Sequence, residues 1–389
     1  MGRRGVAPRG YCILPFAIAR ALHLLALSSP AGYSSTVTPT TSAGRFPALD
    51  GLRAIAVALV MVGHAGRWIP IGSLGVAIFF VLSGFLITGL LLQEAEGTGT
   101  IRLRRFYARR ALRIMPAAFV FLAVAWLVLH GTPANPPVGE WLASLSYTND
   151  YYVALHVRRG TQISHMWSLA VEEQFYLLWP ALLLWWRPRG VATVRRHLAI
   201  AVLGTWIWRA GLATIVPPHY LQFAFDTRAD FLALGCLLAV SNQTTVVTAL
   251  GVLTRKNRWL PLIPIAGLGL LTWAMMTSSS RPYALSYPLE GLLIALLLVH
   301  LLAARWRWLD HPAMRMMGTL SYSLYLYHLL ASYFAHRAFV EPWATVLAPV
   351  AALGLAWASY HWIERPLLRW RDQHIPARDV VRRPLAQVA

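Results

Sequence analysis

The sequence alternates between long apolar runs and short connections that are rich in arginine. Ten of the runs approach the length of roughly 20 apolar residues that a helix needs to cross a bilayer. The pattern therefore predicts an all-α polytopic membrane protein, built as a bundle of about ten transmembrane helices. The predicted spans are residues 50–66, 72–92, 114–130, 164–186, 198–216, 227–241, 259–277, 285–304, 319–336 and 343–363.

The basic residues predict the orientation of this bundle. If the N-terminus is cytoplasmic, 28 of the 35 basic residues fall in cytoplasmic segments and seven fall elsewhere. Such a bias is typical of membrane proteins, whose cytoplasmic loops carry an excess of arginine and lysine. We therefore expect both termini to be cytoplasmic and the protein to be a multi-pass protein of the cell (plasma or inner) membrane.

The composition excludes several classes of protein. Only 13% of the 389 residues are charged, which is far below the share in a soluble domain. The net charge of +20 does not indicate nucleic-acid binding, because the basic residues lie between apolar runs. Cys12 and Cys236 are far apart and predict neither a disulfide nor a metal site, so no metal is expected.

Three regions are predicted along the chain. Residues 1–44 form a poorly ordered or interfacial cytoplasmic extension, residues 45–370 the transmembrane domain, and residues 371–389 a basic cytoplasmic tail. The apolar run 13–27 follows basic residues, as in a signal peptide, but Arg20 and His23 interrupt it. Cleavage would also invert the predicted topology, and we therefore favour an extension. The chain ends about twenty residues after its last span, and no further domain is expected.

The first two spans carry a charged pair and a row of small residues. Arg53 and His64 are eleven residues apart, which is close to three helical turns, so they share a face and lie roughly 16 Å apart along the axis. Asp50 precedes Arg53 on that face. An imidazole in an apolar helix is costly, and we interpret His64 as a general base. The second span carries small residues that allow close helix packing: Gly72, Ser73, Gly75, Ser83 and Gly84.

Arginines cluster between residues 102 and 113, before the third span. Arg109 and Arg113 are four residues apart on one helix face, and Arg110 flanks them. Anchoring by the positive-inside bias alone would also place arginines here. The functional interpretation is a phosphate clamp, because arginine makes bidentate contacts with phosphate.

The fourth span opens with a polar face inside an apolar helix. Ser168, Glu172 and Tyr176 share that face, and Glu173 and Gln174 flank it. Carboxylates inside an apolar helix need partners, although a solvated helix mouth would also accommodate them. A carboxylate near His64 could orient the imidazole, so Glu172 is a second catalytic candidate.

Weaker signals lie further along the chain. Asp226, Arg228 and Asp230 mark the start of the sixth span, where an ion pair explains them as well as a binding site does. Tyr322, Tyr325 and His328 lie in the ninth span, where tyrosines at helical spacing are more often packing residues. Glu364, Arg365 and Pro366 are typical of a helix end at the cytoplasmic surface.

Taken together, these motifs resemble the integral-membrane acyltransferase 3 family. The resemblance covers residues 45–370, and six motifs occur in the same order. They are LDGLRAIAVALVMVGH with the Arg53-x10-His64 spacing, GVAIFFVLSGFLIT, FYARRALRIMP, WSLAVEEQFYLLWP, DTRADFLALG and SYSLYLYH.

The resemblance implies transfer of an acyl group, usually acetyl, from cytoplasmic acyl-CoA to a hydroxyl of a carbohydrate. The acceptor is either a surface glycan or a sugar on a secondary metabolite. The family's arginine–histidine pair falls on Arg53 and His64, its arginine motif on Arg109, Arg110 and Arg113, and its glutamate motif on Glu172 and Gln174. Candidate substrate-binding residues are Asp50, Trp167, Ser168, Gln174, Tyr176, Arg228 and Asp230.

Two other classes remain possible on the sequence alone. In a proton-coupled exporter, His64 and Glu172 would relay protons. Against it, the chain shows no repeated halves, which many transporters have. A membrane scaffold would not need clustered charges inside its spans.

Overall fold

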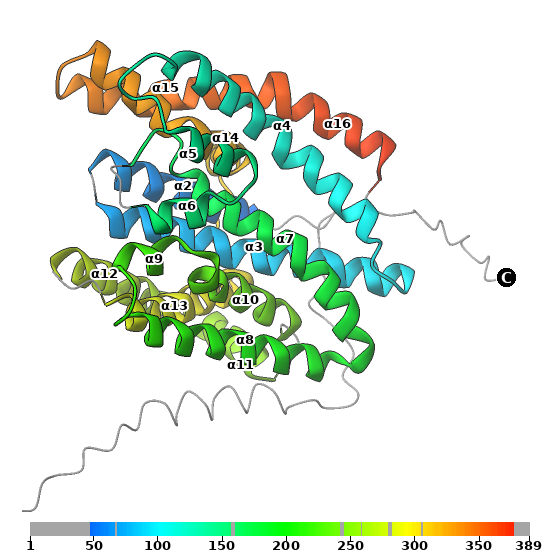
Figure 1. Cartoon of the computed structure of the whole chain (residues 1–389). Coiled ribbons are helices and arrows are strands. Elements are labelled where there is room, and N and C mark those ends of the chain that lie inside the picture. The colour runs from blue at the N-terminus through cyan, green and yellow to red at the C-terminus, as the bar shows by residue number, and fades with distance from the viewer. Residues whose placement is uncertain are drawn as a thin grey trace, which may run out of the picture.

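The computed structural model describes residues 47–66, 68–156, 160–241, 245–257, 259–278, 282–304 and 306–376. Within these ranges the protein consists of helices and connecting segments, without a strand, as predicted. The predicted N-terminal extension 1–44 lies outside the described residues, and so does the tail from residue 377 onward. Figure 1 shows the bundle of helices.

Each of the ten predicted spans overlaps one helix of at least sixteen residues. Shorter helices connect them or cap the ends of the bundle. The ten long helices are α2 (Pro47–Ala65), α3 (Ile69–Thr98), α4 (Leu103–Leu129), α7 (Met166–Trp186), α8 (Val191–Leu212), α10 (Phe225–Ser241), α12 (Leu262–Thr277), α13 (Tyr283–Ala303), α14 (Pro312–Ala338) and α15 (Trp343–Ser359). The others are α5 (Val138–Leu145), α6 (Asn149–Leu155), η1 (Arg187–Arg189), α9 (Pro218–Phe223), α11 (Thr245–Lys256), η2 (Tyr360–Glu364) and α16 (Arg365–His374).

Length and composition support membrane insertion for half of these helices. Among the described residues, five helices are long and apolar enough to cross a membrane. They are Ala48–Ala65, Ile69–Thr98, Leu103–Leu129, Tyr283–Ala303 and Trp343–His374. These five helices are consistent with a membrane protein. The ten membrane crossings and the cytoplasmic location of both termini stay predictions.

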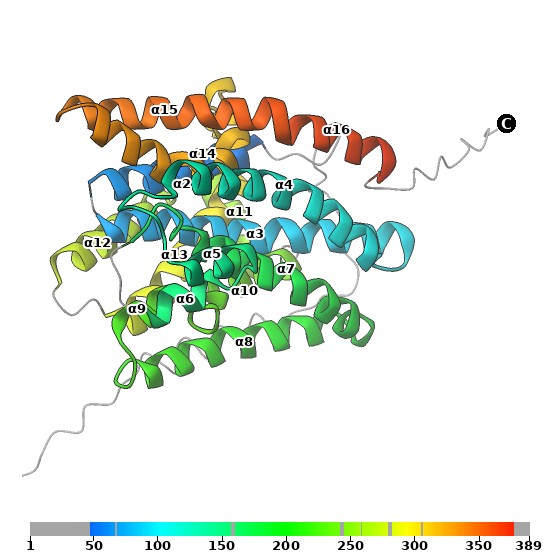
Figure 2. The ribbon, with the colours of Figure 1, turned by 45° about the horizontal axis from the view of Figure 1, so that its top comes forward.

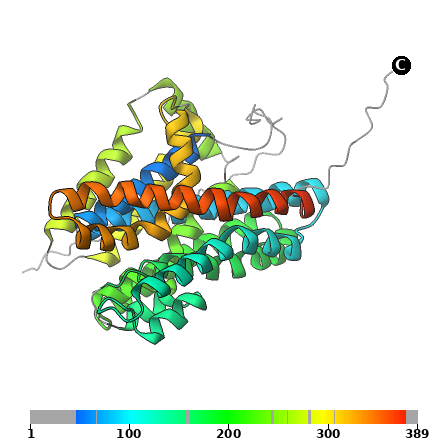
Figure 3. The ribbon, with the colours of Figure 1, turned by 90° about the horizontal axis from the view of Figure 1, so that it is seen from above.

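The bundle has two distinct ends. The small helices α5, α6 and α9 gather at one end, where α2 finishes and α3 begins, and we call this the short-helix end (Figure 1). The α3–α4 connection and α16 lie at the opposite end, which we call the arginine end (Figure 2). Seen from above, α15, η2 and α16 form one continuous rod along the bundle (Figure 3).

Helix α3 lies in the middle of the bundle and touches its neighbours through glycine. A Cβ added to Gly84 would lie 2.0 Å from the carbonyl oxygen of Leu232, and one added to Gly235 would lie 2.1 Å from that of Val81. Only glycine fits where α3 and α10 cross. This confirms the prediction that small residues of the second span allow close helix packing.

Helix α2 is held in the same way on both sides. A Cβ on Gly75 of α3 would lie 2.5 Å from the carbonyl oxygen of Ala56. A Cβ on Gly318 of α14 would lie 2.0 Å from that of Asp50. Helices α14, α2, α3 and α10 therefore form a row in backbone contact, which we call the central row.

Candidate active site

A pocket opens among α2, α3, α4, α7 and α14, and three arginines meet in it. We call it the arginine pocket. It encloses about 730 Å³, including its open mouth. Its apolar wall comes mainly from α3, through residues such as Val76, Phe79 and Phe80. Its polar lining consists of Arg53, Ser83, Arg110, Arg113, Ser168, Glu172, Tyr176, Ser321, Tyr322 and Tyr325.

The three arginines come from two helices. The guanidinium of Arg53 donates to the hydroxyl of Ser321 at 3.3 Å and lies 5.9 Å from the ring centre of Phe79. Arg110 and Arg113 are three residues apart on α4, so they share a helix face. The guanidinium of Arg110 lies 4.4 Å from the ring centre of Tyr176. This places a row of positive charge along one wall of the pocket.

Arg109 does not join this cluster. Its guanidinium donates to the Asp372 carboxylate at 3.0 Å and to the carbonyl of Ile375, so it ties α4 to α16. The predicted trio of arginines is thus divided, because the Arg109 side chain pairs with α16 whereas Arg110 and Arg113 line the pocket. Arg53 takes its place in the pocket.

Two carboxylates lie close to the arginines. The hydroxyl of Ser83 donates to Glu172 at 2.6 Å, inside the pocket. Glu364, which the sequence identifies only as a helix end, is buried beside α14 and accepts a hydrogen bond from Ser323. The wide turn of the π-helix η2 brings this carboxylate inward, where it interacts electrostatically with Arg113 and Arg53. The positive charge of the pocket is therefore partly balanced.

Three histidines meet at the short-helix end, beyond the pocket lining at Ser168 and Tyr325. The ring of His328 lies 4.8 Å from that of His64 and 5.1 Å from that of His165. The hydroxyls of Ser168 and Tyr325 are 2.5 Å apart, and the hydroxyl of Tyr325 donates to the carbonyl of His165. Hydroxyls of the pocket thus lead directly to the histidine group.

His64 occupies the last turn of α2, and much of the residue is exposed. Its Nδ1 lies 2.8 Å from the carbonyl oxygen of Val60. A neutral imidazole that donates from Nδ1 keeps Nε2 free to accept a proton. Glu172, which we predicted as the group that orients His64, has Ser83 as its partner in this structure. The Val60 carbonyl orients the ring instead.

Sequence reasoning missed His165 and assigned His328 to packing. Both are buried, and His165 Nδ1 and His328 Nε2 have no hydrogen-bond partner among the described residues. The available signal was spacing, because His165 and Ser168 are three residues apart, as are Tyr325 and His328. Nothing in the sequence indicated that the two pairs face each other.

Gln174 lies outside the arginine pocket and links α7 to the short helices. Its amide donates to Asp150 at 2.9 Å and to the carbonyl of Tyr147. Asp150 also accepts from the backbone N–H of Phe225. Burial raises the pKa of Asp150 to about 6, although these hydrogen bonds favour its ionised form. Gln174 therefore has a structural role here.

The remaining predicted residues lie among neighbouring helices. Asp50 packs by its backbone against α14, and Trp167 is buried with its ring 5.1 Å from that of Phe223. Asp230 forms a buried ion pair with Arg209 at 2.6 Å. Arg228 is fully buried, with its guanidinium 4.1 Å from the ring centre of Tyr287.

Comparison with known proteins identifies the family of this chain. The acyltransferase 3 family, described as an acyltransferase domain, matches residues 46–361. Peptidoglycan O-acetyltransferase OatA of Listeria monocytogenes is 32% identical over an alignment of 355 residues, which covers 82% of this chain and 55% of the relative. A protein of Bacillus subtilis, YrhL, assigned as a peptidoglycan O-acetyltransferase, is 28% identical over 82% of this chain and 54% of the relative.

The chain spans a little over half the length of these relatives. No solved structure matches it. The family match covers most of the chain and contains every residue of the arginine pocket and of the histidine group. The chain therefore belongs to the acyltransferase 3 family.

Proposed function

We propose that this protein transfers an acetyl group from cytoplasmic acetyl-CoA to a hydroxyl of a carbohydrate. The observation that carries the proposal is the arginine pocket with the histidine group beyond it. An anionic donor bound in the arginine pocket would lie next to a histidine that can accept a proton. The family match and the names of the relatives support the same reaction.

The donor fits the arginine pocket by charge and by shape. Coenzyme A has a polyanionic head and a long, mostly apolar arm that ends in the thioester. Arg53, Arg110 and Arg113 would bind phosphate oxygens, for which guanidinium groups are well suited. The apolar wall of α3 would hold the arm, with the thioester directed toward Ser168 and Tyr325.

The reaction needs a base and a route for the proton. Nε2 of His64 would take the proton of the acceptor hydroxyl as its oxygen attacks the thioester carbonyl. The tetrahedral intermediate collapses, the bond from carbon to sulfur breaks, and the thiolate of coenzyme A receives the proton from the imidazolium. Glu172, held by Ser83, would keep the neighbouring guanidinium groups in place for the donor.

The acceptor follows from the relatives rather than from the pocket. Two of them are named for peptidoglycan. We therefore propose a glycan of the cell envelope as the acceptor, reached from the outer face of the plasma membrane. In this arrangement the short-helix end faces outward, the arginine end faces the cytoplasm, and the ten long helices cross the bilayer.

The test uses purified protein in detergent, acetyl-CoA with a labelled acetyl group, and soluble peptidoglycan fragments. We expect label to appear in ester linkage on the carbohydrate. Release of labelled acetate from acetyl-CoA without an acceptor would show that the donor half of the reaction works. Absence of both reactions would contradict the proposal.

A further inference from the structure

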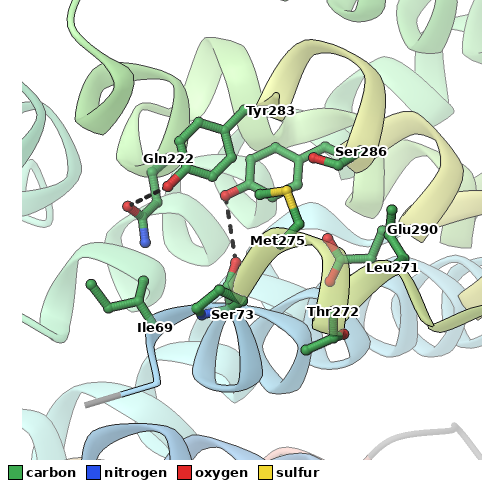
Figure 4. Close-up of a pocket in the computed structure, with 11 residues that line it drawn as sticks. Ile69, Ser73, Gln222, Leu271, Thr272, Met275, Tyr283, Ser286 and Glu290 are labelled. Atoms are coloured by element: carbon green, nitrogen blue, oxygen red, sulfur yellow. Dashed lines mark hydrogen bonds between the residues drawn. The ribbon is translucent and has the colours of Figure 1, made fainter. Parts of the chain in front are cut away.

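A second cavity lies at the short-helix end and is lined by the first turn of α3, whereas the arginine pocket is lined by later turns of the same helix. It is formed by the first turn of α3, the last turns of α12, the start of α13 and helix α9 (Figure 4). We call it the tyrosine cavity, because Tyr283 and Tyr287 form one of its walls. Its empty space, including its open mouth, is about 330 Å³.

The polar side chains of this cavity contact one another. Tyr283 donates to the amide oxygen of Gln222 at 3.4 Å, and Ser73 lies 3.5 Å from the hydroxyl of Tyr287. Both contacts are drawn in Figure 4. These residues are thus held in place by each other, in a cavity that no described side chain fills.

Two further polar groups line the cavity and are available to a ligand. Ser286 is buried, and its hydroxyl has no hydrogen-bond partner among the described residues. Burying such a group unpaired is unfavourable, which indicates a missing partner. The carboxylate of Glu290 points into the cavity from one turn further along α13 (Figure 4).

Two arginines that do not line the cavity lie near the carboxylate of Glu290. Arg228 and Arg209 interact with it electrostatically, and Arg209 also pairs with Asp230. Two arginines and two carboxylates thus face one another in this region. Arg228, which the sequence suggested as a substrate contact, therefore acts through Glu290 and through the ring of Tyr287, against which it lies.

The lining selects one class of ligand. A phosphate group would be repelled by the Glu290 carboxylate, and an acyl chain would leave the hydroxyl of Ser286 without a partner. A metal ion is disfavoured because the described residues hold no cluster of suitable ligands. A sugar ring has hydroxyls that donate and accept, and apolar faces that pack on Tyr283, Tyr287 and Met275.

The cavity also lies close to the proposed base. A Cβ on Gly72 would lie 3.8 Å from the imidazole of His64, and the next residue, Ser73, lines the cavity. Only the first turn of α3, which begins at Ile69, separates the two. We infer that the tyrosine cavity binds one sugar ring of a carbohydrate acceptor while a neighbouring ring presents its hydroxyl to His64. This inference rests on the proposed function.

The experiment measures binding and donor use separately in the full-length protein in detergent micelles. The binding probe is the tetramer of N-acetylglucosamine, titrated by calorimetry. We expect the wild type to bind it and Glu290→Gln to weaken binding about tenfold, as loss of a hydrogen bond to a charged group does. Thr272→Trp, which narrows the cavity from α12, should weaken binding at least as much.

Leu285→Ala is the matched control, because this exposed residue precedes Ser286 on α13 but lies outside the cavity lining. It should bind the tetramer like the wild type. All variants should keep the wild-type KM for acetyl-CoA in the hydrolysis of that donor, which also shows that they are folded. Binding unchanged in both cavity variants, or no binding by the wild type, would overturn the inference. Loss of acetyl-CoA turnover in the wild type would instead overturn the proposed function.

Discussion

The arginine pocket and the tyrosine cavity are both lined by α3, at different turns of the helix, and they differ in charge. Three arginines and one carboxylate line the first, whereas one carboxylate and no cation line the second. The difference matches two kinds of ligand, a polyanionic donor and a neutral, hydroxyl-rich acceptor. His64, in the last turn of α2, lies against the first turn of α3, from which Ser73 lines the tyrosine cavity. If the proposed function is correct, the comparison teaches that the two substrates are sorted by charge before they meet.

Removal of the imidazole of His64 should cause the largest loss of activity, because the acceptor hydroxyl then has no base. We expect His64→Ala to lower the rate of acetyl transfer by about 10²–10⁴-fold, as loss of a general base does. Binding of acetyl-CoA and of the sugar tetramer should stay unchanged. The measurement is kcat for acetyl transfer by purified protein. His130→Ala, at the exposed end of α4, is the control, and near wild-type turnover of His64→Ala would contradict its role as base.

The second prediction concerns α3, which lines both regions, and its backbone contact with α10 at Gly84. Gly84→Val would force a side chain into the backbone of Leu232, so the helices must separate. We expect loss of the folded protein, seen as aggregation in size-exclusion chromatography. Gly89→Val is the control on the same helix, because a Cβ there meets no neighbour within 4 Å. Equal yields of folded protein for the two variants would argue against a backbone contact at Gly84.

The use of acetyl-CoA can be weakened without a change in the binding of the sugar. Arg113→Ala and Arg53→Ala should raise the KM for acetyl-CoA roughly tenfold or more, since a charge-assisted contact is lost. The binding of the sugar tetramer should not change. Arg109→Ala is the matched control, because Arg109 pairs with Asp372 rather than lining the pocket. A larger KM effect at Arg109 than at Arg113 would show that the donor phosphates bind nearer α16.

The smallest effect concerns Asp150, which links α6 to α7 near the acceptor side. Burial raises the pKa of its carboxyl to about 6, above the usual value of 3.8, so the folded state binds this proton more tightly than the unfolded chain. The stabilising contribution is complete below about pH 4 and is lost as the pH rises through 6.

The difference between the unfolding temperatures of wild type and Asp150→Asn isolates this group, since all other carboxyl groups are common to both. We expect the wild type to lose stability relative to the variant by a few degrees between pH 4 and pH 7. A difference that does not vary with pH would mean that Asp150 does not titrate in this range. Asp310→Asn, in the connection between α13 and α14, is the control.

The sequence predicted the helices well because each apolar run is long and is bounded by charged or turn residues. It also predicted the close approach made possible by Gly84. The direction in which each side chain points was harder to predict. Arg109 and Arg110 are adjacent in sequence, yet only Arg110 lines the pocket, since neighbouring residues point in directions about 100° apart on a helix.

Partners that come from distant helices could not be predicted at all. His165 and His328 approach each other across 163 positions of sequence, and the π-helix η2 brings Glu364 toward Arg113. Glu290 and Ser286 lie in an apolar run whose pattern indicates a span and nothing more. That they line a cavity is visible only in the folded structure, where α12 and α9 contribute the other walls.

The central row of α14, α2, α3 and α10 also constrains how the protein moves. Helices in backbone contact cannot slide or tilt past one another without a clash, so the row should behave as one rigid body. Substrates must then enter through motion of the helices that flank the row, α4 at the arginine pocket and α12 at the tyrosine cavity. Distances between spin labels within the row should stay constant when acetyl-CoA binds, whereas distances from α3 to α4 should change. The site for chemistry is thereby fixed while its two entrances open independently.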